Sequence, residues 1–340
     1  MDDVLLSIAI PTFNRKALLL RLLNSILKNS LNGIEIIISD NHSNDGTKEY
    51  FEMLNDSRIR YIYNHENLGF DRNYLQCCNV ARGKYVWIIG SDDIVSEDAV
   101  SNIFHFLNHN KVDLLFINHS FFSGIYDENK KYDTFLDPQK HSFVTENKSE
   151  FIRIVNKQIT FLSALIFNKD KVKNIADPAY FCGTFFIHTC LAFCVTKEQS
   201  SKMGIIFKPL LMDDLTPSNS SVESQITPVF TIFGRHLRHV FLEIASQCSY
   251  PVMLMRKIYF KTNRHSIATA ILKAKMNNID NWKRPFWEDG YPSVKDDVQS
   301  RMLVLVAYLC PRFIACFLIN KVRPLYRTVK CIFNRISSKK

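Results

Sequence analysis

Lys84–Asp93 reads KYVWIIGSDD, an apolar run that ends in two adjacent carboxylates. A second run, Ile34–Asp40 (IEIIISD), also ends in an acid, and Asp45 follows in the same loop. Both runs are too short and too rich in β-branched residues for helices, so they are predicted to be strands. In open α/β sheets, ligands lie outside the carboxyl ends of the parallel strands. The acids therefore predict a ligand site at one edge of a parallel sheet.

The same pattern extends outward over the first 118 residues. Five runs are predicted to be strands: Leu5–Pro11, Ile34–Asp40, Ile59–Asn64, Tyr85–Gly90 and Val112–Asn118. Four segments between them have apolar residues three and four apart, which predicts helices: Arg15–Asn29, Gly46–Leu54, Asp71–Ala81 and Ser96–Asn108. Alternation at this length predicts right-handed βαβ crossovers and a mostly parallel sheet covered on both faces.

Beyond residue 118 the pattern loosens into a polar stretch, predicted to be loops or a lid. Alternation then resumes weakly, with a predicted strand at Phe161–Asn168 and a helix at Thr184–Lys197. From Pro228 the chain is predicted to be mainly helical, starting with an amphipathic helix at Val229–Gln247. We therefore divide the chain into 1–118, 119–227 and 228–340.

The formal net charge of +10 is concentrated at one end, because residues 301–340 hold nine Lys or Arg and no acid. In the same region, Met302–Ile319 is mostly apolar but is interrupted by Pro311-Arg312. A helix in the interface of an anionic membrane is the favoured interpretation, and a terminal helix packed on the protein's own core is the alternative. Nine cysteines without a regular framework, and no secretion signal at the N-terminus, indicate a reducing compartment.

Three segments follow one another in a characteristic order: LLSIAIPTFNRKALLLRLLNSI, IEIIISDNHSNDGT and NHENLGFDRNYLQCCNVARGKYVWIIGSDD. In this order and spacing the chain resembles family 2 glycosyltransferases, most of all bacterial O-antigen sugar transferases of the abequosyltransferase kind. The resemblance implies a GT-A fold, in which a mostly parallel twisted sheet carries helices on both faces. It also implies a metal-dependent, inverting transfer of a sugar from a nucleotide-diphosphate donor to a glycan, specifically a lipid-linked precursor of O-antigen or surface polysaccharide.

The resemblance assigns roles to the acids of the fourth strand. Asp92 and Asp93 would hold Mg²⁺ or Mn²⁺ against the diphosphate, because oxygen ligands suit these ions better than zinc. The alternative is that both carboxylates cap the helix starting near Ser96. The family's D-x-D begins with an acid where this chain has Gly90, which leaves two ligands and puts anchoring of the ribose in doubt.

Further residues match the nucleotide-sugar pocket of the family. Pro11, Thr12 and Arg15 follow the first strand, where the alternative is a simple strand-to-helix turn. Asp40 is expected to accept a hydrogen bond from a base, and loop closure is its alternative, as it is for Asp45. Three positions before the fourth strand complete the predicted site, Gly69, Arg72 and Asn73, and helix capping is the alternative for Asn73.

The acceptor hydroxyl needs a base, and His188 stands where the family pattern would place an acid. Histidine suits proton transfer near neutral pH, although a lone His among Phe and Cys is often a core residue. Asp213-Asp214 is the reserve candidate. The resemblance covers about the first 118 residues, and we assign 1–118 to the donor and 119–227 to the acceptor. The basic, apolar C-terminal pattern predicts that 228–340 carries a helix at the inner face of the cell membrane. The rival function is a non-catalytic glycan- or membrane-binding module, and no nucleic-acid partner is expected.

Overall fold

The computed structural model describes residues 4–29, 32–54, 56–127, 130, 132–215 and 228–319. These residues fall into two compact units. The first unit holds the described residues up to 215 together with Ile244–Leu254, and the second holds 228–243 and 255–319.

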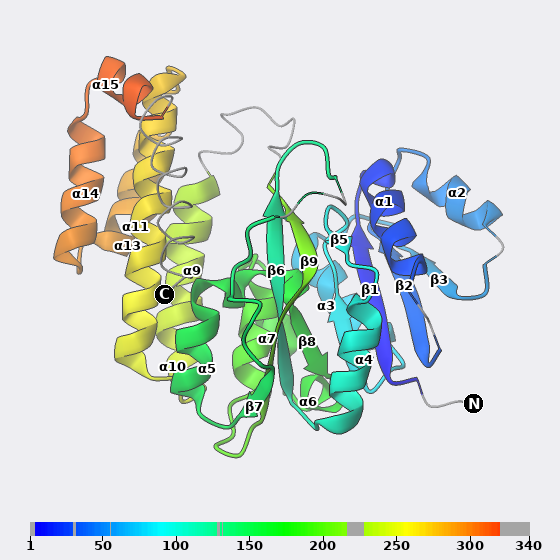
Figure 1. Cartoon of the computed structure of the whole chain (residues 1–340). Helices are drawn as coiled ribbons and strands as arrows, with labels where there is room; N and C mark the ends of the chain where they lie inside the picture. Colours follow the sequence, from blue (N-terminus) through cyan, green and yellow to red (C-terminus); the bar gives the residue numbers. More distant parts are fainter. Residues whose placement is uncertain are drawn as a thin grey trace. The chain divides into compact units, whose positions relative to one another are not determined.

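A nine-stranded sheet forms the centre of the first unit, in the order β3-β2-β1-β4-β8-β6-β9-β5, with β7 paired to β9 (Figure 1). The strands are β1 (Leu6–Thr12), β2 (Ile34–Asp40), β3 (Ile59–Tyr63), β4 (Tyr85–Ile88), β5 (Ile94–Val95), β6 (Leu114–Phe122), β7 (Phe143–Thr145), β8 (Leu165–Asn168) and β9 (Met203–Asp214). The first four strands are parallel, whereas β8 runs antiparallel to both of its neighbours. The sheet is therefore mixed, with a parallel half that ends at one edge.

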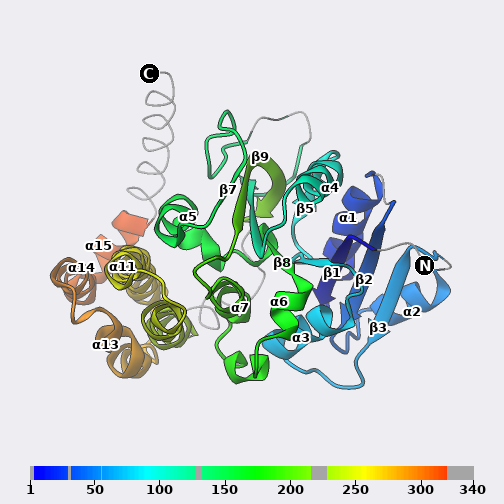
Figure 2. The same cartoon turned by 90° about the horizontal axis from the view of Figure 1, so that it is seen from below.

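Helices cover both faces of this sheet, as the sequence pattern predicts. Figure 2 shows α1 (Lys16–Leu27) and α4 (Ala99–His109) on one face, and α3 (Phe70–Val80), α6 (Lys169–Lys173) and α7 (Ile187–Val195) on the other. Helices α2 (Thr47–Met53) and α5 (Lys148–Val155) also belong to this unit. Helix α1 illustrates the cause, because its apolar side chains at spacings of three and four, including Leu19, Leu22 and Ile26, are all buried.

All five strands expected in the first 118 residues are present, and the strand expected at Phe161–Asn168 is β8. Three strands lay outside the sequence prediction: β5, β7 and β9. Strand β9 is parallel to β6, and β5 is antiparallel to β9. These additions matter for the site, because the end of β9 brings Asp213 and Asp214 to the edge where Asp92 and Asp93 lie.

The second unit is helical, and its core contains Phe230, Ile267, Trp282, Phe286 and Val304. The predicted helix at Val229–Gln247 is a run of short helical segments: η4 (Phe230–His236), α9 (Leu237–His239), η5 (Val240–Ile244) and α10 (Ala245–Gln247). The last of these, α10, belongs to the first unit. It is followed by α11 (Val252–Met276), α12 (Lys283–Pro285), η6 (Phe286–Gly290), α13 (Tyr291–Val294), α14 (Val298–Leu309) and α15 (Arg312–Phe317).

The apolar segment 302–319 forms two helices with a break at Cys310-Pro311, so proline interrupts it as expected. Within the part of the chain that the structure describes, no helix combines the length and the apolar character needed to cross a bilayer. Seven of the nine basic residues of 301–340 lie outside the described residues, and Arg301 and Arg312 lie within them.

Candidate active site

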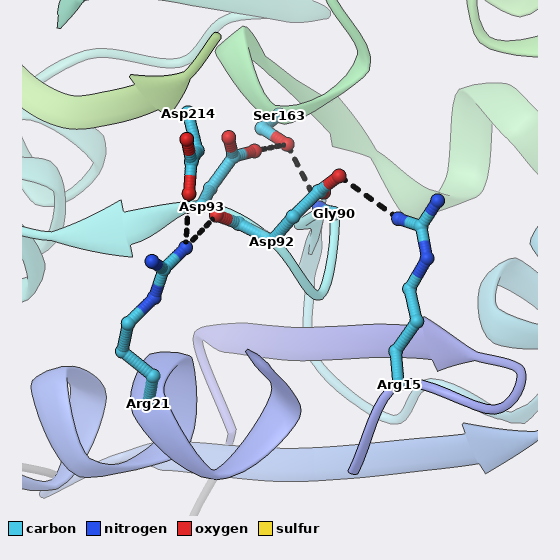
Figure 3. Close-up of polar contacts among 7 residues, drawn as sticks. All are labelled: Arg15, Arg21, Gly90, Asp92, Asp93, Ser163 and Asp214. Atoms are coloured by element: carbon cyan, nitrogen blue, oxygen red, sulfur yellow. Dashed lines mark hydrogen bonds and ion pairs between the residues drawn. The ribbon is translucent and has the colours of Figure 1, made fainter. Parts of the chain in front are cut away.

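The turn after β4 holds the two neighbouring carboxylates in different environments. The Asp93 amide donates to the Gly90 carbonyl at 3.1 Å, and the Asp93 side chain is buried. The Ser163 hydroxyl donates to the Asp93 carboxylate at 2.5 Å and accepts from the Gly90 amide at 2.8 Å (Figure 3). Asp92 is half-exposed, and its carboxylate pairs with the Arg15 guanidinium at 2.8 Å. One carboxylate is thus fixed inside the fold while the other faces outward.

Gly90 has a steric role in this turn. A Cβ atom at this position would lie 3.0 Å from Oδ1 of Asp92 and 3.3 Å from Oδ2 of Asp93. An aspartate here would also add a negative charge to two carboxylates already in close contact with the position. The missing first acid of D-x-D is therefore accounted for by a turn that packs both carboxylates against residue 90.

The end of β9 brings two more carboxylates to this corner. Ile94 pairs with Met212 and Val95 with Leu211, and continuing that antiparallel register places Asp93 opposite Asp213. The Arg21 guanidinium, from α1, donates to the Asp214 carboxylate at 2.8 Å and also to the Asp92 carbonyl (Figure 3). Arg21 thereby ties the acidic turn to the end of β9.

The crowded carboxylates shift each other's proton affinities. Burial raises the pKa of Asp93 well above its usual value, and the charges of Asp92 and Asp213 raise it further. Burial, followed by the charges of Asp92 and Asp214, raises the pKa of Asp213 to about 6. Like charges held together in this way favour protonation or a bound cation.

The donor atoms at this corner are carboxylate oxygens, which are the ligands preferred by Mg²⁺ and Mn²⁺. Among the described residues, no three His, Cys, Asp or Glu side chains form a metal site on their own. A divalent ion that takes one or two carboxylates and completes its shell with phosphate oxygens and water needs no such group. Asp92 and Asp93 fit this kind of ion.

Two loops at the same edge of the sheet hold each other in place. The Asp45 carboxylate accepts from the Lys16 amide at the start of α1 at 2.8 Å, and also from the Thr47 hydroxyl at 2.5 Å. The Asn14 amide donates to the Ser43 hydroxyl at 2.9 Å. Asp45 therefore has the loop-closing role that was its alternative, and it bonds the start of α1 as well as that of α2.

Asp40 is fully buried at the end of β2, where it pairs with Thr12 of β1. Its carboxylate accepts from the Ser43 amide at 2.8 Å and from the Tyr61 hydroxyl at 2.6 Å. Both oxygens thus have partners within the fold, as loop closure requires. The buried Thr12 hydroxyl oxygen has no hydrogen-bond partner, and Pro11 beside it is partly exposed, so this strand end keeps polar capacity for a ligand.

Gly69 and Arg72 line a cavity of about 370 Å³, together with Asp71, Cys182 and Phe185. Gly69 has φ of +77°, which favours glycine. The Asp71 carboxylate accepts from the Gly183 amide at 2.7 Å and from the Phe185 amide at 3.0 Å. Asp71 therefore holds the loop before α7.

Asn73 is turned into the fold, unlike its neighbour Arg72. It is buried, accepts from the Ser39 hydroxyl at 2.6 Å and donates to the Ser39 carbonyl at 3.1 Å. Asn64 also donates to it, at 3.2 Å. Both ends of the Asn73 amide are thus used between α3 and β2.

His188 lies in the core on α7. Its Nε2 contacts the Thr160 carbonyl at 2.9 Å, its Nδ1 is buried without a partner, and its ring packs near Phe70 and Tyr74. Burial lowers the pKa of His188 to about 4, against a smaller opposing effect of the Thr160 carbonyl. A neutral, enclosed imidazole of this kind favours the core alternative over proton transfer.

The segment that carries the acidic corner is similar to a known protein family. Residues 7–171 match the sequence model described as Glycosyl transferase family 2. This segment belongs to glycosyltransferase family 2. The matched segment spans β1 to β8 and therefore includes Asp40, Asp92, Asp93 and Ser163 of the glycosyltransferase domain.

Two curated glycosyltransferases illustrate the sequence relationship. Abequosyltransferase RfbV of Salmonella typhimurium is 31% identical over 62% of this chain and 66% of its own length. The GalNAc(5)-diNAcBac-PP-undecaprenol beta-1,3-glucosyltransferase of Campylobacter jejuni is 35% identical over 29% of this chain and 33% of its own length. The matches thus span between a third and about two thirds of these relatives.

Solved structures share the GT-A fold of this chain at low sequence identity. TarS of S. aureus, solved in complex with UDP-GlcNAc, aligns over 89% of both chains with a TM-score of 0.57 and 14% identity. Mannosyltransferase PcManGT of Pyrobaculum calidifontis, solved with GDP-Man and Mn²⁺, aligns over 93% of this chain and 86% of its own, with a TM-score of 0.53 and 14% identity.

Two residues that build the acidic corner lay outside the sequence prediction, Arg21 and Ser163. Arg21 lies within the leucine-rich pattern of α1, which predicts a surface residue at this position. Ser163 lies in η2 (Leu162–Ala164), a turn before β8 that carries no motif. Neither position has a local signal, because the residues that they bond are distant in the sequence. Arg21 is 71 positions from Asp92, and Ser163 is 70 positions from Asp93. The adjacent acids Asp213-Asp214 were the one available signal for the contribution of β9.

Proposed function

We propose that this chain is an inverting glycosyltransferase that moves a sugar from a nucleotide-diphosphate donor to a glycan acceptor. The observation that carries the proposal is the carboxylate corner, in which the turn that holds Asp92 and Asp93 lies beside Asp213 and Asp214 of β9 at the carboxyl edge of the sheet. Ser163 and Arg21 hold this corner in place before any ligand binds. Such preorganisation is what a site for a charged leaving group requires.

Asp92 and Asp93 would hold a Mg²⁺ or Mn²⁺ ion, which when bound neutralises charge on the diphosphate as a Lewis acid. Arg15 is paired with Asp92 through an exposed contact. An exposed pair of this kind costs little to separate, so Arg15 is available to a donor phosphate. Thr12 with its unpartnered hydroxyl, and Gly69 with Arg72 at their cavity, are the remaining donor contacts in this proposal.

Asp213 is the base that we assign to the acceptor hydroxyl. The acceptor oxygen bonds to the anomeric carbon from the face opposite the diphosphate, the bond from that carbon to the phosphate oxygen breaks, and the acceptor proton passes to Asp213. A pKa near 6 leaves this carboxylate ionised but basic at neutral pH, as general-base catalysis requires. Its position opposite Asp93 brings it to the acidic turn, whereas His188 is enclosed in the core.

We assign a lipid-linked acceptor, presented at the inner face of the cell membrane. The Campylobacter relative is named for an undecaprenol-linked acceptor. In this chain, α14 and α15 expose a row of apolar side chains: Met302 (58%), Val306 (62%), Leu309 (76%), Phe313 (74%) and Phe317 (59%). The row repeats at three or four residues and lies in a region with nine Lys or Arg and no acid. These features suit an anionic bilayer surface.

Hydrolysis of donors tests the assignment without knowledge of the acceptor. The purified chain is incubated with Mn²⁺ and a panel of uridine, cytidine, guanosine and thymidine diphosphate sugars, and release of nucleotide diphosphate is measured. We expect slow release from one nucleotide class, loss of release in chelator and in Asp93→Asn, and retention of the fold in that variant. If no donor is bound or cleaved by the wild-type chain, the non-catalytic module is the better description.

A further inference from the structure

Three aromatic rings lie directly beside the carboxylate corner, and the assigned donor and metal contacts do not use them. They are Phe122 at the end of β6, with Tyr126 and Tyr132 from the loop that follows; we call them the aromatic shelf. Tyr126 and Tyr132 stack, with ring centroids 5.7 Å apart and planes 16° apart. Both meet the Phe122 ring edge-on, at 5.4 Å and 6.2 Å. The shelf is therefore an ordered group of rings rather than scattered aromatic residues.

The shelf is joined to the acidic corner by neighbouring strands. Phe122 pairs with Asp214 in the register of β6 and β9, and the Leu215 amide donates to the Phe122 carbonyl at 2.8 Å. The Arg21 guanidinium lies 5.4 Å from the centre of the Phe122 ring while it bonds Asp214. Apolar ring surface thus begins one strand away from Asp213 and Asp214.

Exposure shows that the shelf is not simply core. Phe122 is buried, but Tyr126 and Tyr132 are only partly buried. Next to them, Ile125 is 95% exposed and Leu215 is 53% exposed. Among the described residues, the Arg21 guanidinium lies at the Phe122 ring and the Lys130 ammonium lies 5.6 Å from the Tyr132 ring centre. The Asp127 amide donates to the Tyr132 hydroxyl at 2.9 Å. An apolar surface with partly exposed tyrosines is a common feature of binding sites.

We propose that the aromatic shelf is the acceptor subsite, which binds one pyranose ring of the glycan acceptor by stacking. A pyranose has a face of C–H bonds that suits an aromatic ring, and an edge of hydroxyls that suits carboxylates. The corner offers both surfaces side by side, with Tyr126 and Tyr132 for the C–H face and Asp213 for a hydroxyl. A saccharide held in this way points a hydroxyl at Asp213. The inference rests on the proposed transferase function and names the residues that select its acceptor.

Saturation-transfer NMR on the full chain tests the subsite directly. The probes are methyl α-glycosides of galactose, mannose, rhamnose and N-acetylglucosamine, each offered to the wild-type chain and to Tyr126→Ala, Tyr132→Ala and Tyr126→Phe. We expect binding of at least one glycoside that is about 2- to 10-fold weaker in each alanine variant and unchanged in Tyr126→Phe, because stacking needs the ring and not the hydroxyl. Tyr50→Ala, which removes a 38% exposed tyrosine on α2, is the matched control and is expected to bind normally.

The same variants are assayed for hydrolysis of the donor in the absence of acceptor, which separates the two proposals. Normal hydrolysis with weakened glycoside binding in the alanine variants supports the subsite. Normal hydrolysis with equal glycoside binding in wild type and variants overturns the subsite and leaves the transferase proposal standing. Absence of hydrolysis in the wild type counts against the transferase itself. No glycoside binding to the wild-type chain overturns the subsite.

Discussion

Arg21 binds the Asp214 carboxylate at 2.8 Å and so links α1 to the end of β9. The Asp214 side chain is 8% exposed and that of Arg21 is 30% exposed. Arg21→Ala leaves this carboxylate without its guanidinium in a nearly dry position. We expect a loss of about 1–3 kcal/mol in the free energy of unfolding, between the values typical of exposed and of buried pairs. Urea denaturation measures it.

Arg15→Ala is the matched control, because it breaks another arginine–aspartate pair of 2.8 Å at the same corner. The side chains of Arg15 and Asp92 are 47% and 42% exposed, so loss of this ion pair should change the free energy of unfolding by less than about 1 kcal/mol. Equal destabilisation by the two variants would contradict a structural role for Arg21. A fall in donor affinity in Arg15→Ala at nearly unchanged stability would support its assignment to the donor.

Asp213 makes the free energy of unfolding depend on pH. Its pKa in the folded chain, about 6, lies above the ordinary aspartate value, so the folded state holds a proton that the unfolded state has released. The free energy of unfolding should therefore fall as pH rises from about 4 to about 6. Asp213→Asn should remove this part of the fall and raise the free energy of unfolding at pH 7 by about 3 kcal/mol. Denaturation at pH 4.5, 6 and 7.5 measures the effect.

Asp213 should also make the rate of sugar transfer rise with pH, over the range in which the free energy of unfolding falls. Because a base works only when ionised, kcat/KM in the wild type should rise through pH 6 and then level off. Asp213→Asn should lower kcat about 10²- to 10⁴-fold with little change in donor KM. His188→Gln is the comparison, and we expect it to lower stability while leaving the pH profile in place. If the rise of kcat/KM with pH is lost in His188→Gln but not in Asp213→Asn, His188 and not Asp213 is the general base.

Local patterns predict the parallel half of the sheet because each strand and helix there is encoded by its own spacing of apolar residues, as in Leu19, Leu22 and Ile26. The corner of the site is different, since Ser163 and Arg21 reach it from distant elements and only the folded chain brings them to Asp93 and Asp92. His188 shows a further limit. Its spacing on α7 fits the family pattern, but burial beside Phe70 and Tyr74, which decides its chemistry, depends on packing.

Asp40 and Tyr61 share a hydrogen bond of 2.6 Å, and this allows recognition of a base to be separated from loop closure. Tyr61→Phe removes the hydroxyl that donates this bond, and Asp40→Asn weakens its acceptor. If Asp40 only closes the loop, both variants should lose about 1 kcal/mol in the free energy of unfolding and bind donors equally well. If Asp40 reads the base, as the family resemblance implies, only Asp40→Asn should weaken binding of nucleotide diphosphate. Isothermal titration with the nucleotide found by hydrolysis distinguishes these outcomes.

Gly90 offers a test of the acidic turn, because a side chain here would approach the two carboxylates to 3.0 Å and 3.3 Å. Gly90→Asp restores the family's first acid, yet it should lower metal affinity and transfer because it forces Asp92 and Asp93 apart. Gly90→Ala adds the Cβ without the charge and should have a smaller effect. Titration of Mn²⁺ against each variant measures the difference. Improved transfer in Gly90→Asp would show that the turn can accept the D-x-D arrangement.

The exposed row on α14 and α15 predicts binding to anionic vesicles. Val306 and Phe313 are 62% and 74% exposed, so Val306→Asp with Phe313→Asp should leave the fold intact while opposing insertion into a lipid interface. We expect the wild-type chain to sediment with phosphatidylglycerol vesicles more than with phosphatidylcholine vesicles, and less so as salt is raised. Met53→Asp, at an 84% exposed position on α2, is the control and should sediment as the wild type does. Equal sedimentation of the double variant and the control would mean that this row does not meet the membrane.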